Sequence, residues 1–372
     1  MTRWRWRGSV ALLGVAIAFV IYPLIEGEND VINSDWPAFA TGARLIVENP
    51  GHLYDLDVQR RTQLEVTGGR TLVTLGIKGI LPFLAPAWVA FIAAPFDLLG
   101  TNIGGRLWIV FELACLAVGL YLAVRPRPPT EWLPAFAGVP TALMMLNAQL
   151  DGLVALGIGA AIALRTKPYI AGLALGLTLV KPHLVLPLGL ALLVARMWRV
   201  LVGWAAAGLV LLLSTLALNP HWVVDWLKSA GSTVQPGSRE VDIAHFGALL
   251  PAGGQTFAVY GLALVTVVAV VLLAWKRRGE LRSSGAVIVA GGVLAAPHAL
   301  PTDLVLVAVA LAIWGQAAWY DWLLLSAGAA VAALLPAPVP AVVGVLVIDW
   351  VCLRAGGVIP VWRRGPALAS AG

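Results

Sequence analysis

The chain has 372 residues and a formal net charge of +6, with 60% hydrophobic and 12% charged residues. Soluble domains average about 25% charged residues, so this composition excludes an ordinary soluble enzyme. It predicts an all-α polytopic membrane protein that forms one membrane-embedded domain over residues 1–372. The basic residues flank apolar runs, where they set orientation in the membrane, and give no sign of a nucleic-acid partner.

The first apolar run, residues 10–25, follows Arg3, Arg5 and Arg7. It ends in Tyr22-Pro23-Leu24-Ile25, without the small residues of a signal-peptide cleavage site, so we expect an uncleaved first helix. The amino terminus is then cytoplasmic by the positive-inside rule. Arg outnumbers Lys among the basic residues and Ala, Gly and Val are abundant, which is typical of a GC-rich bacterial genome and indicates a bacterial plasma membrane.

Further apolar runs follow, and counting them at roughly 20 residues per crossing predicts about twelve transmembrane helices. This count places Arg196/Arg199, Lys276–Arg278 and Arg363/Arg364 in the cytoplasm, as the positive-inside rule requires. It places Arg125/Arg127 and Arg165/Lys167 outside, against the rule. Either the short runs between 132 and 164 do not cross fully, or these cations face outward for another reason.

Two polar segments, residues 26–80 and 219–255, fall on the extracytoplasmic side in this count. A loop of about 55 residues is far longer than a usual connection and indicates a functional loop. Its apolar residues recur at helical spacing from Trp36 to Val47, which predicts an amphipathic helix lying on the membrane surface. A second helix is expected from Asp55 to about Val66. Asp35, at the start of the first helix, suits a helix cap and a catalytic base equally well.

Charged and polar residues also interrupt the apolar runs. Lys181 lies inside the run 169–195, where a central charge costs about 2.5 to 3.5 kcal/mol, so it should pair with an anion or line a polar cavity unless it reaches an interface. Gln149, Asp151, His298 and Asp303 each suit an interface when taken alone. Together they indicate a shared polar site.

Cys115 and Cys352 both fall inside apolar runs, which favours small core residues over a disulfide or a metal site. The sequence also lacks the patterns of a zinc protease, a P-loop or a nucleophile elbow. We therefore expect neither a metal nor a cofactor.

The order of several short motifs resembles glycosyltransferase family 87, which has the GT-C fold and includes polyprenyl-phosphate-dependent mannosyltransferases and arabinofuranosyltransferases. The motifs lie between residues 35 and 303. They are Asp35 with Leu53-Tyr54-Asp55, Leu84-Ala85-Pro86-Ala87, Asn147-Ala148-Gln149, Ala171–Gly176 with Lys181-Pro182, and Ala296-Pro297-His298 with Asp303. Ala148 stands where the family usually has glycine, Asp151 near an expected asparagine, and Thr302 in an aromatic position.

The resemblance implies inverting transfer of a sugar, mannose in our interpretation, from a polyprenyl-phosphate donor to a lipid or glycan acceptor on the outer face of the membrane. Such a reaction needs a general base for the acceptor hydroxyl and groups that stabilise the departing phosphate. The resemblance assigns the base to Asp35. It makes Lys181 and His298 the candidate phosphate partners, with Arg165/Lys167 as weaker ones, and Gln149, Tyr54 and Asp303 the residues that orient the sugar or its surroundings.

Two other classes of function stay open at this point. A transporter or lipid flippase could use Lys181 and Asp303 as an intramembrane charge pair. A non-catalytic scaffold for envelope synthesis would require neither Asp35 nor Lys181.

Overall fold

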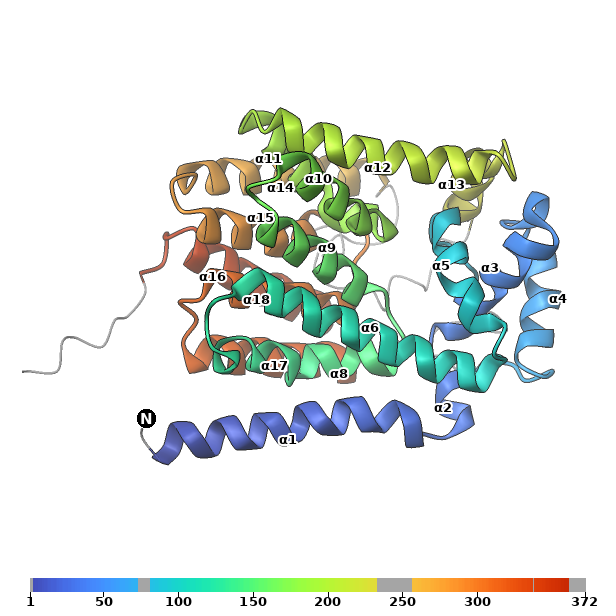
Figure 1. Ribbon diagram of the computed structural model, residues 1–372, viewed down its shortest axis with the longest axis horizontal. Coiled ribbons are helices and arrows are strands. Elements are labelled where there is room, and N and C mark those ends of the chain that lie inside the picture. Colours follow the sequence, from blue (N-terminus) through green and yellow to red (C-terminus); the bar gives the residue numbers. More distant parts are fainter. Residues whose placement is uncertain (1–2, 73–80, 233–255, 337, 361–372) are drawn as a thin grey trace, which may run out of the picture.

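The computed structural model describes residues 3–72, 81–232, 256–336 and 338–360, and this part of the chain contains helices and no strands (Figure 1). The predicted segment 219–255 is therefore described only as far as residue 232, and Arg363/Arg364 lie outside the described residues. The α-helices are α1 (Arg3–Ile25), α2 (Glu28–Ile32), α3 (Trp36–Glu48), α4 (Leu56–Val66), α5 (Ala87–Asp97), α6 (Thr101–Val124), α7 (Leu133–Phe136), α8 (Val139–Leu146), α9 (Asp151–Ala163), α10 (Pro168–Leu175), α11 (Leu186–Val194), α12 (Trp198–Leu216), α13 (Trp222–Ser232), α14 (Thr256–Lys276), α15 (Leu281–Ala295), α16 (Leu304–Trp314), α17 (Trp319–Leu334) and α18 (Val339–Ala355). The short 3₁₀ turns used below are η3 (Gly176–Val180), η4 (Pro182–Val185) and η7 (Pro301–Asp303).

Four helices in the described part of the chain are long and apolar enough to cross a membrane: α1, α6, α12 and α14. The other apolar helices have 17 residues or fewer. At about 1.5 Å per residue, the 13 residues of α9 span roughly 20 Å, short of a hydrocarbon core about 30 Å thick. The prediction of about twelve full crossings is therefore not confirmed.

Several short helices instead form hairpins that enter the bundle and return to the same end. In hairpin 2, formed by α10 and α11, Gly172 lies against Val200 and Gly203, and Gly176 lies against Ala207, so α10 runs parallel to α12. The chain then turns at Lys181 and α11 comes back, with Gly189 against Trp204. The sequence predicted a single span over 169–195, and Lys181-Pro182 is where that run turns back.

Hairpins 1 and 3 have the same form. In hairpin 1 (α8 and α9), α9 runs parallel to α6, because Gly152 lies against Glu112 and Gly159 against Gly119. In hairpin 3 (α15 and α16), Ser283 near the start of α15 and Trp314 at the end of α16 line one small cavity, so the hairpin opens at one end of the bundle. The turns of the three hairpins carry the polar segments 147–151, 181–183 and 298–303.

The open ends of these hairpins lie at one end of the bundle, which we call the basic end. Arg127 donates hydrogen bonds to the carbonyls of Ala312 and Ile313, at 2.7 and 3.3 Å, and so lies beside the end of α16. Arg277 borders the cavity that Trp314 lines, which places it at the same end. Lys167 immediately precedes α10, which is parallel to α12 and so starts at the same end as Arg199.

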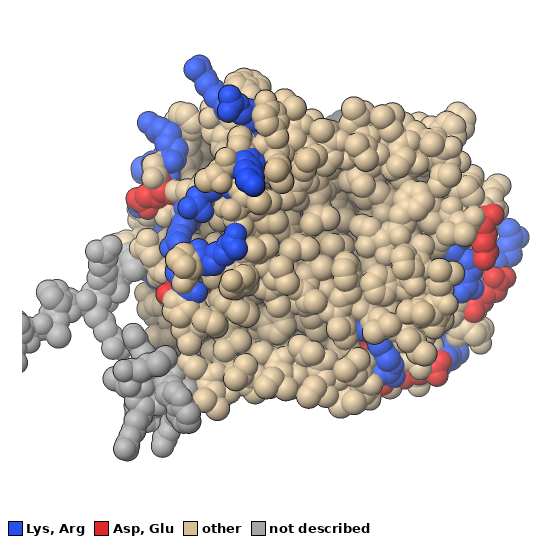
Figure 2. Space-filling view, viewed as in Figure 1, with Lys and Arg blue, Asp and Glu red and all other residues tan. Residues whose placement is uncertain are grey.

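This arrangement corrects the placement of Arg125/Arg127 and Arg165/Lys167 on the side opposite the other basic clusters. The physical reason is that the short apolar runs turn back within the bundle, so the connections between them return to one end. Figure 2 shows the result on one face: Lys and Arg dominate the end where α1 begins, both signs of charge mix at the other end, and an uncharged band separates them. Such a band is what a protein surrounded by lipid needs.

The opposite end, which we call the loop end, is built from α2 to α5 with α13. Here α3 is almost completely buried, because it packs against α4, α5 and α6. The prediction that α3 lies on the membrane surface is therefore wrong for this structure. Small residues allow the close packing: at Gly42 an added Cβ would overlap the ring of Phe83.

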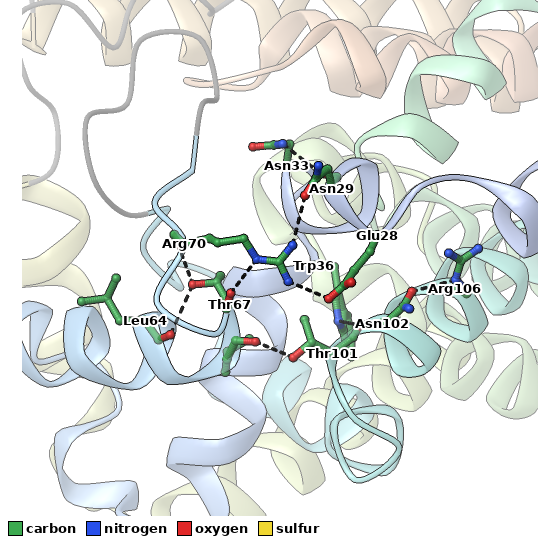
Figure 3. A network of polar contacts seen from close by, with 11 residues as sticks. Glu28, Asn29, Asn33, Trp36, Leu64, Thr67, Arg70, Thr101, Asn102 and Arg106 are labelled. Carbon is green, nitrogen blue, oxygen red and sulfur yellow. Dashed lines mark hydrogen bonds and ion pairs between the residues drawn. The ribbon is translucent and has the colours of Figure 1, made fainter.

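Polar contacts fix this layer at its edge. Arg70 donates to the side chains of Glu28 and Asn29, at 2.6 and 3.0 Å, and so joins the end of α4 to α2 (Figure 3). Thr101 donates to the Val66 carbonyl at 2.6 Å and its own carbonyl accepts the Trp36 indole N–H at 2.8 Å. The loop that precedes α3 is thereby held in one position on the bundle.

The hairpin arrangement predicts which loops share a side of the membrane. Single cysteines at the exposed positions Lys167 and Arg199 should be labelled by a membrane-impermeant thiol reagent from the same side, and a cysteine at Arg61 from the opposite side. The native Cys115 and Cys352 are buried and provide a low background. Labelling of the Lys167 and Arg199 positions from opposite sides would contradict the hairpins.

Candidate active site

The turns of the three hairpins meet at a buried ammonium group. Lys181 Nζ lies 2.6 Å from Asp303 Oδ1 and 3.0 Å from Asp151 Oδ2. Lys181 is 7% exposed, and the two carboxylate residues are 1% and 0% exposed. Each of the three comes from a different hairpin, so this ion triad ties the hairpins together. The prediction that Lys181 pairs with an anion is confirmed.

Local sequence explains why these side chains stand at turns. Lys181 lies between η3 and η4, and Pro182 after it cannot donate a backbone hydrogen bond, which interrupts the helix. In hairpin 3, Asp303 Oδ2 accepts the Leu300 N–H at 2.6 Å and closes the η7 turn. Interrupted backbone is tolerated at membrane depth where protein surrounds it.

Asp35 approaches this cluster from the loop end. Its backbone N–H donates to the Asn147 carbonyl at 3.2 Å, and its carboxylate accepts a hydrogen bond from the Gln149 side chain. Asp35 occupies the position before α3, but its side chain makes no capping hydrogen bond. The sequence is compatible with either a helix cap or a catalytic base at Asp35, and the structure shows that the carboxylate does not cap α3. Asp55, by contrast, caps α4 through the N–H groups of Asp57 and Val58.

The surroundings of Asp35 make it a weaker acid than usual. Burial raises the pKa of the Asp35 carboxyl to about 7, the positive charge of Lys181 opposes the increase, and the negative charge of Asp303 adds to it. Asp35 as a whole residue is partly exposed. A partly accessible carboxylate with a pKa near neutrality has the properties of a general base.

Two histidines lie on the accessible side of the cluster. The rings of His183 and His298 have centroids 6.3 Å apart. His298 is exposed and His183 is partly exposed, whereas Lys181 is buried. His298 was among the predicted site residues, and His183 was not. The described residues contain no group of three or more His, Cys, Asp or Glu side chains that could hold a metal ion.

Tyr54, predicted to orient the sugar, has a different environment. It is buried, and its hydroxyl donates to the Ala85 carbonyl at 2.8 Å. Its ring stacks on Phe83 and Trp222, with centroids 6.0 and 6.2 Å away. No contact joins Tyr54 to Asp35 or Lys181 among those of the described residues, so its observed role is to hold α13 against the first loop.

The connection in hairpin 1 has an unusual backbone. Ala148 has a φ of 52°, in the left-handed region that glycine adopts freely and other residues rarely adopt. Its carbonyl accepts the Trp108 indole N–H at 2.9 Å. This turn presents the Asn147 carbonyl and the Gln149 amide to Asp35, and a left-handed residue explains why glycine suits this position.

Two of the residues near this site have no role predicted from the sequence. Asp151 is expected in the shared polar site but without an assigned partner, and in the structure it accepts a hydrogen bond from Lys181. Glu112 was overlooked: it is 1% exposed in the middle of α6, and its Oε2 accepts the Leu153 N–H at 3.0 Å. A carboxylate inside an apolar span was the signal that could have identified it.

The ion triad predicts a large effect for the loss of its cation. Lys181→Met keeps the length of the side chain but leaves Asp151 and Asp303 without their counter-charge, which should lower the free energy of unfolding by about 3 to 5 kcal/mol. Denaturation of the purified protein in detergent, followed by tryptophan fluorescence, measures the change. The exposed Lys167→Met provides the matched control, expected within about 0.5 kcal/mol of the unaltered protein. Equal stability of the two variants would contradict a triad that holds the hairpins together.

Comparison with known proteins adds an independent finding. The sequence profile of glycosyltransferase family 87 matches residues 83–300, more than half of the chain. This range contains Gln149, Asp151, Lys181 and His298, whereas Asp35 and Asp303 lie outside it. Searches of the curated proteins and of the solved structures found no match.

Proposed function

Because the chain belongs to glycosyltransferase family 87, we propose that it transfers a sugar, mannose, from a polyprenyl-phosphate donor to a lipid or glycan acceptor with inversion at the anomeric carbon. The observation that carries the proposal is the position of Asp35, a partly accessible carboxylate fixed by Gln149 beside a buried charge cluster. Transfer takes place on the outer face of a bacterial plasma membrane in this proposal.

Asp35 acts as the general base. It removes the proton of the acceptor hydroxyl as that oxygen attacks the anomeric carbon, while the bond from this carbon to the phosphate oxygen breaks and the phosphate leaves with the electron pair. Gln149 holds the Asp35 carboxylate by donating a hydrogen bond to it. A positioned base of this kind typically contributes 10² to 10⁴ in rate.

The departing phosphate needs hydrogen-bond donors that face the accessible side. We assign this part to His298, which is exposed, with the partly exposed His183 beside it. Lys181 was predicted to contact the phosphate, but its ammonium is buried between two carboxylates. We therefore assign Lys181 to holding the three hairpin turns in place. Arg165 and Lys167 lie near the basic end, away from the cluster, and have no part in the proposal.

The three residues expected to orient the sugar form hydrogen bonds with other groups of the protein. Gln149 binds Asp35, both oxygens of Asp303 are engaged by Lys181 and the Leu300 N–H, and Tyr54 binds the Ala85 carbonyl. In this proposal these residues fix the shape of the site. Asp35 and the two histidines are the groups that contact the sugar.

The distribution of charge supports one orientation of the protein in the membrane for this proposal. With the Lys- and Arg-rich end in the cytoplasm, the loop end faces outward and carries Asp35 with it. The segments 26–80 and 219–255 are then the extracytoplasmic loops. A donor whose lipid tail stays in the membrane can reach Asp35 from this side.

A transporter or flippase using the Lys181–Asp303 pair is less well supported. The pair exists, but Asp151 adds a second carboxylate and all three residues are nearly inaccessible. Family membership favours transfer of a sugar over movement of a solute.

Replacement of the base tests the proposal. In membranes that carry Asp35→Asn, transfer of labelled mannose from polyprenyl-phosphate mannose to endogenous acceptors should fall about a hundredfold or more, because the amide cannot accept the proton. Product formation is measured by extraction and chromatography of the labelled material.

The matched control is Asp57→Asn, an exposed carboxylate in the same loop, which should transfer at the unaltered rate. Undiminished transfer by the Asp35→Asn protein would rule out Asp35 as the base. Uptake of solute into vesicles without any glycosylated product would favour a transporter.

A further inference from the structure

Glu112 is a buried acid for which the proposed reaction has no use. It lies in α6, the longest apolar helix of the described chain, and is 1% exposed. One carboxyl oxygen accepts the Leu153 N–H at 3.0 Å, in the first turn of α9, and the other, Oε1, has no hydrogen-bond partner. A buried carboxylate oxygen without a partner is costly, so its protonation state requires an explanation.

The charges around Glu112 do not balance. Glu112, Asp151 and Asp303 are three carboxyl groups in one apolar interior. Among the described residues, Lys181 is the single ammonium that contacts any of them, and it contacts Asp151 and Asp303. Both oxygens of Asp303 have partners, whereas Asp151 Oδ1 and Glu112 Oε1 have none. The amino end of α9 offsets only part of the excess negative charge. Asp151 bonds Lys181 directly, so Glu112 is the carboxyl group without a cation.

We infer that Glu112 holds a proton at neutral pH and, as a neutral acid, positions the amino end of α9 so that Asp151 meets Lys181 and Gln149 meets Asp35. Gly152 lies directly against the carbonyl and Oε2 of Glu112, so α6 and α9 are in close contact at that point.

In the described part of the chain, the titratable groups that act on Glu112 are Asp151 and Lys181, with the Cys115 thiol on the same helix. Of the other elements packed against α6, α7, α8 and α16 carry no titratable side chain. The charged residues of α1 lie at its amino end, and those of α2, α3 and α5 belong to the loop end. Arg106, on α6 itself, donates to the carbonyls of Pro23 and Glu26 at the end of α1.

Infrared spectroscopy of the purified protein tests the proton directly and does not depend on any activity. At pH 9, above the pKa values of about 7 of Asp35 and Glu26, the unaltered protein should show the carbonyl stretch of a protonated carboxylic acid, shifted in D₂O. The band should be absent from Glu112→Gln and present in Glu48→Gln, which alters an exposed carboxyl group. Glu112→Asp, which keeps the acid and moves the band, replaces Glu112→Gln if that variant does not fold. Absence of the band from the unaltered protein, or its persistence in Glu112→Gln, would overturn the inference.

A second measurement tests the positioning role and rests on the proposed function. Glu112→Ala should lower sugar transfer about tenfold, the equivalent of one lost hydrogen bond, and Glu112→Gln should recover most of it because its amide oxygen still accepts the Leu153 N–H. Equal losses of transfer in Glu112→Ala and Glu112→Gln would contradict the positioning role. If no variant transfers sugar, the proposed function fails and the infrared result still decides the state of Glu112.

Discussion

The pairing of one buried ammonium with two buried carboxylates determines how the rest of this protein is arranged. Lys181, Asp151 and Asp303 come from three hairpins that are too short to cross a membrane. None of these charges is stable alone in an apolar interior. Each hairpin therefore needs the other two, and the turns of all three are drawn to one point inside the bundle.

The hairpins also explain why a polar site can exist at this depth. Their turns contain interrupted backbone, which lipid does not tolerate but a surrounding layer of helices does. The long helices α6, α12 and α14 supply that layer, and the first loop closes it through the buried helix α3. Asp35 thus meets Gln149 at a place that is shielded from bulk solvent yet partly accessible, which strengthens electrostatic effects on a reaction there.

Local chemistry made some of these features predictable. A lysine inside an apolar run is stable only near an anion, so the pairing of Lys181 was predictable from the sequence. Asp35 and Asp55 are residues that favour helix starts, and α3 and α4 do begin directly after them. Hydropathy alone could not distinguish a crossing from a hairpin, because both consist of apolar residues. The burial of α3 and the stacking of Tyr54 on Trp222 depend on contacts between distant segments, which helical periodicity does not encode. Glu112 and Asp151 are also charged residues within or beside apolar runs, so the argument that identified Lys181 applies to them as well.

The stereochemistry of the product tests the role of Asp35 most directly. A single carboxylate that activates the acceptor hydroxyl allows attack only from the face opposite the departing phosphate, so the anomeric configuration must invert. Proton NMR of the glycosylated product, compared with the polyprenyl-phosphate donor of known configuration, decides this. Inversion is the predicted result. Retention would contradict a direct displacement of the phosphate by an acceptor hydroxyl that Asp35 activates.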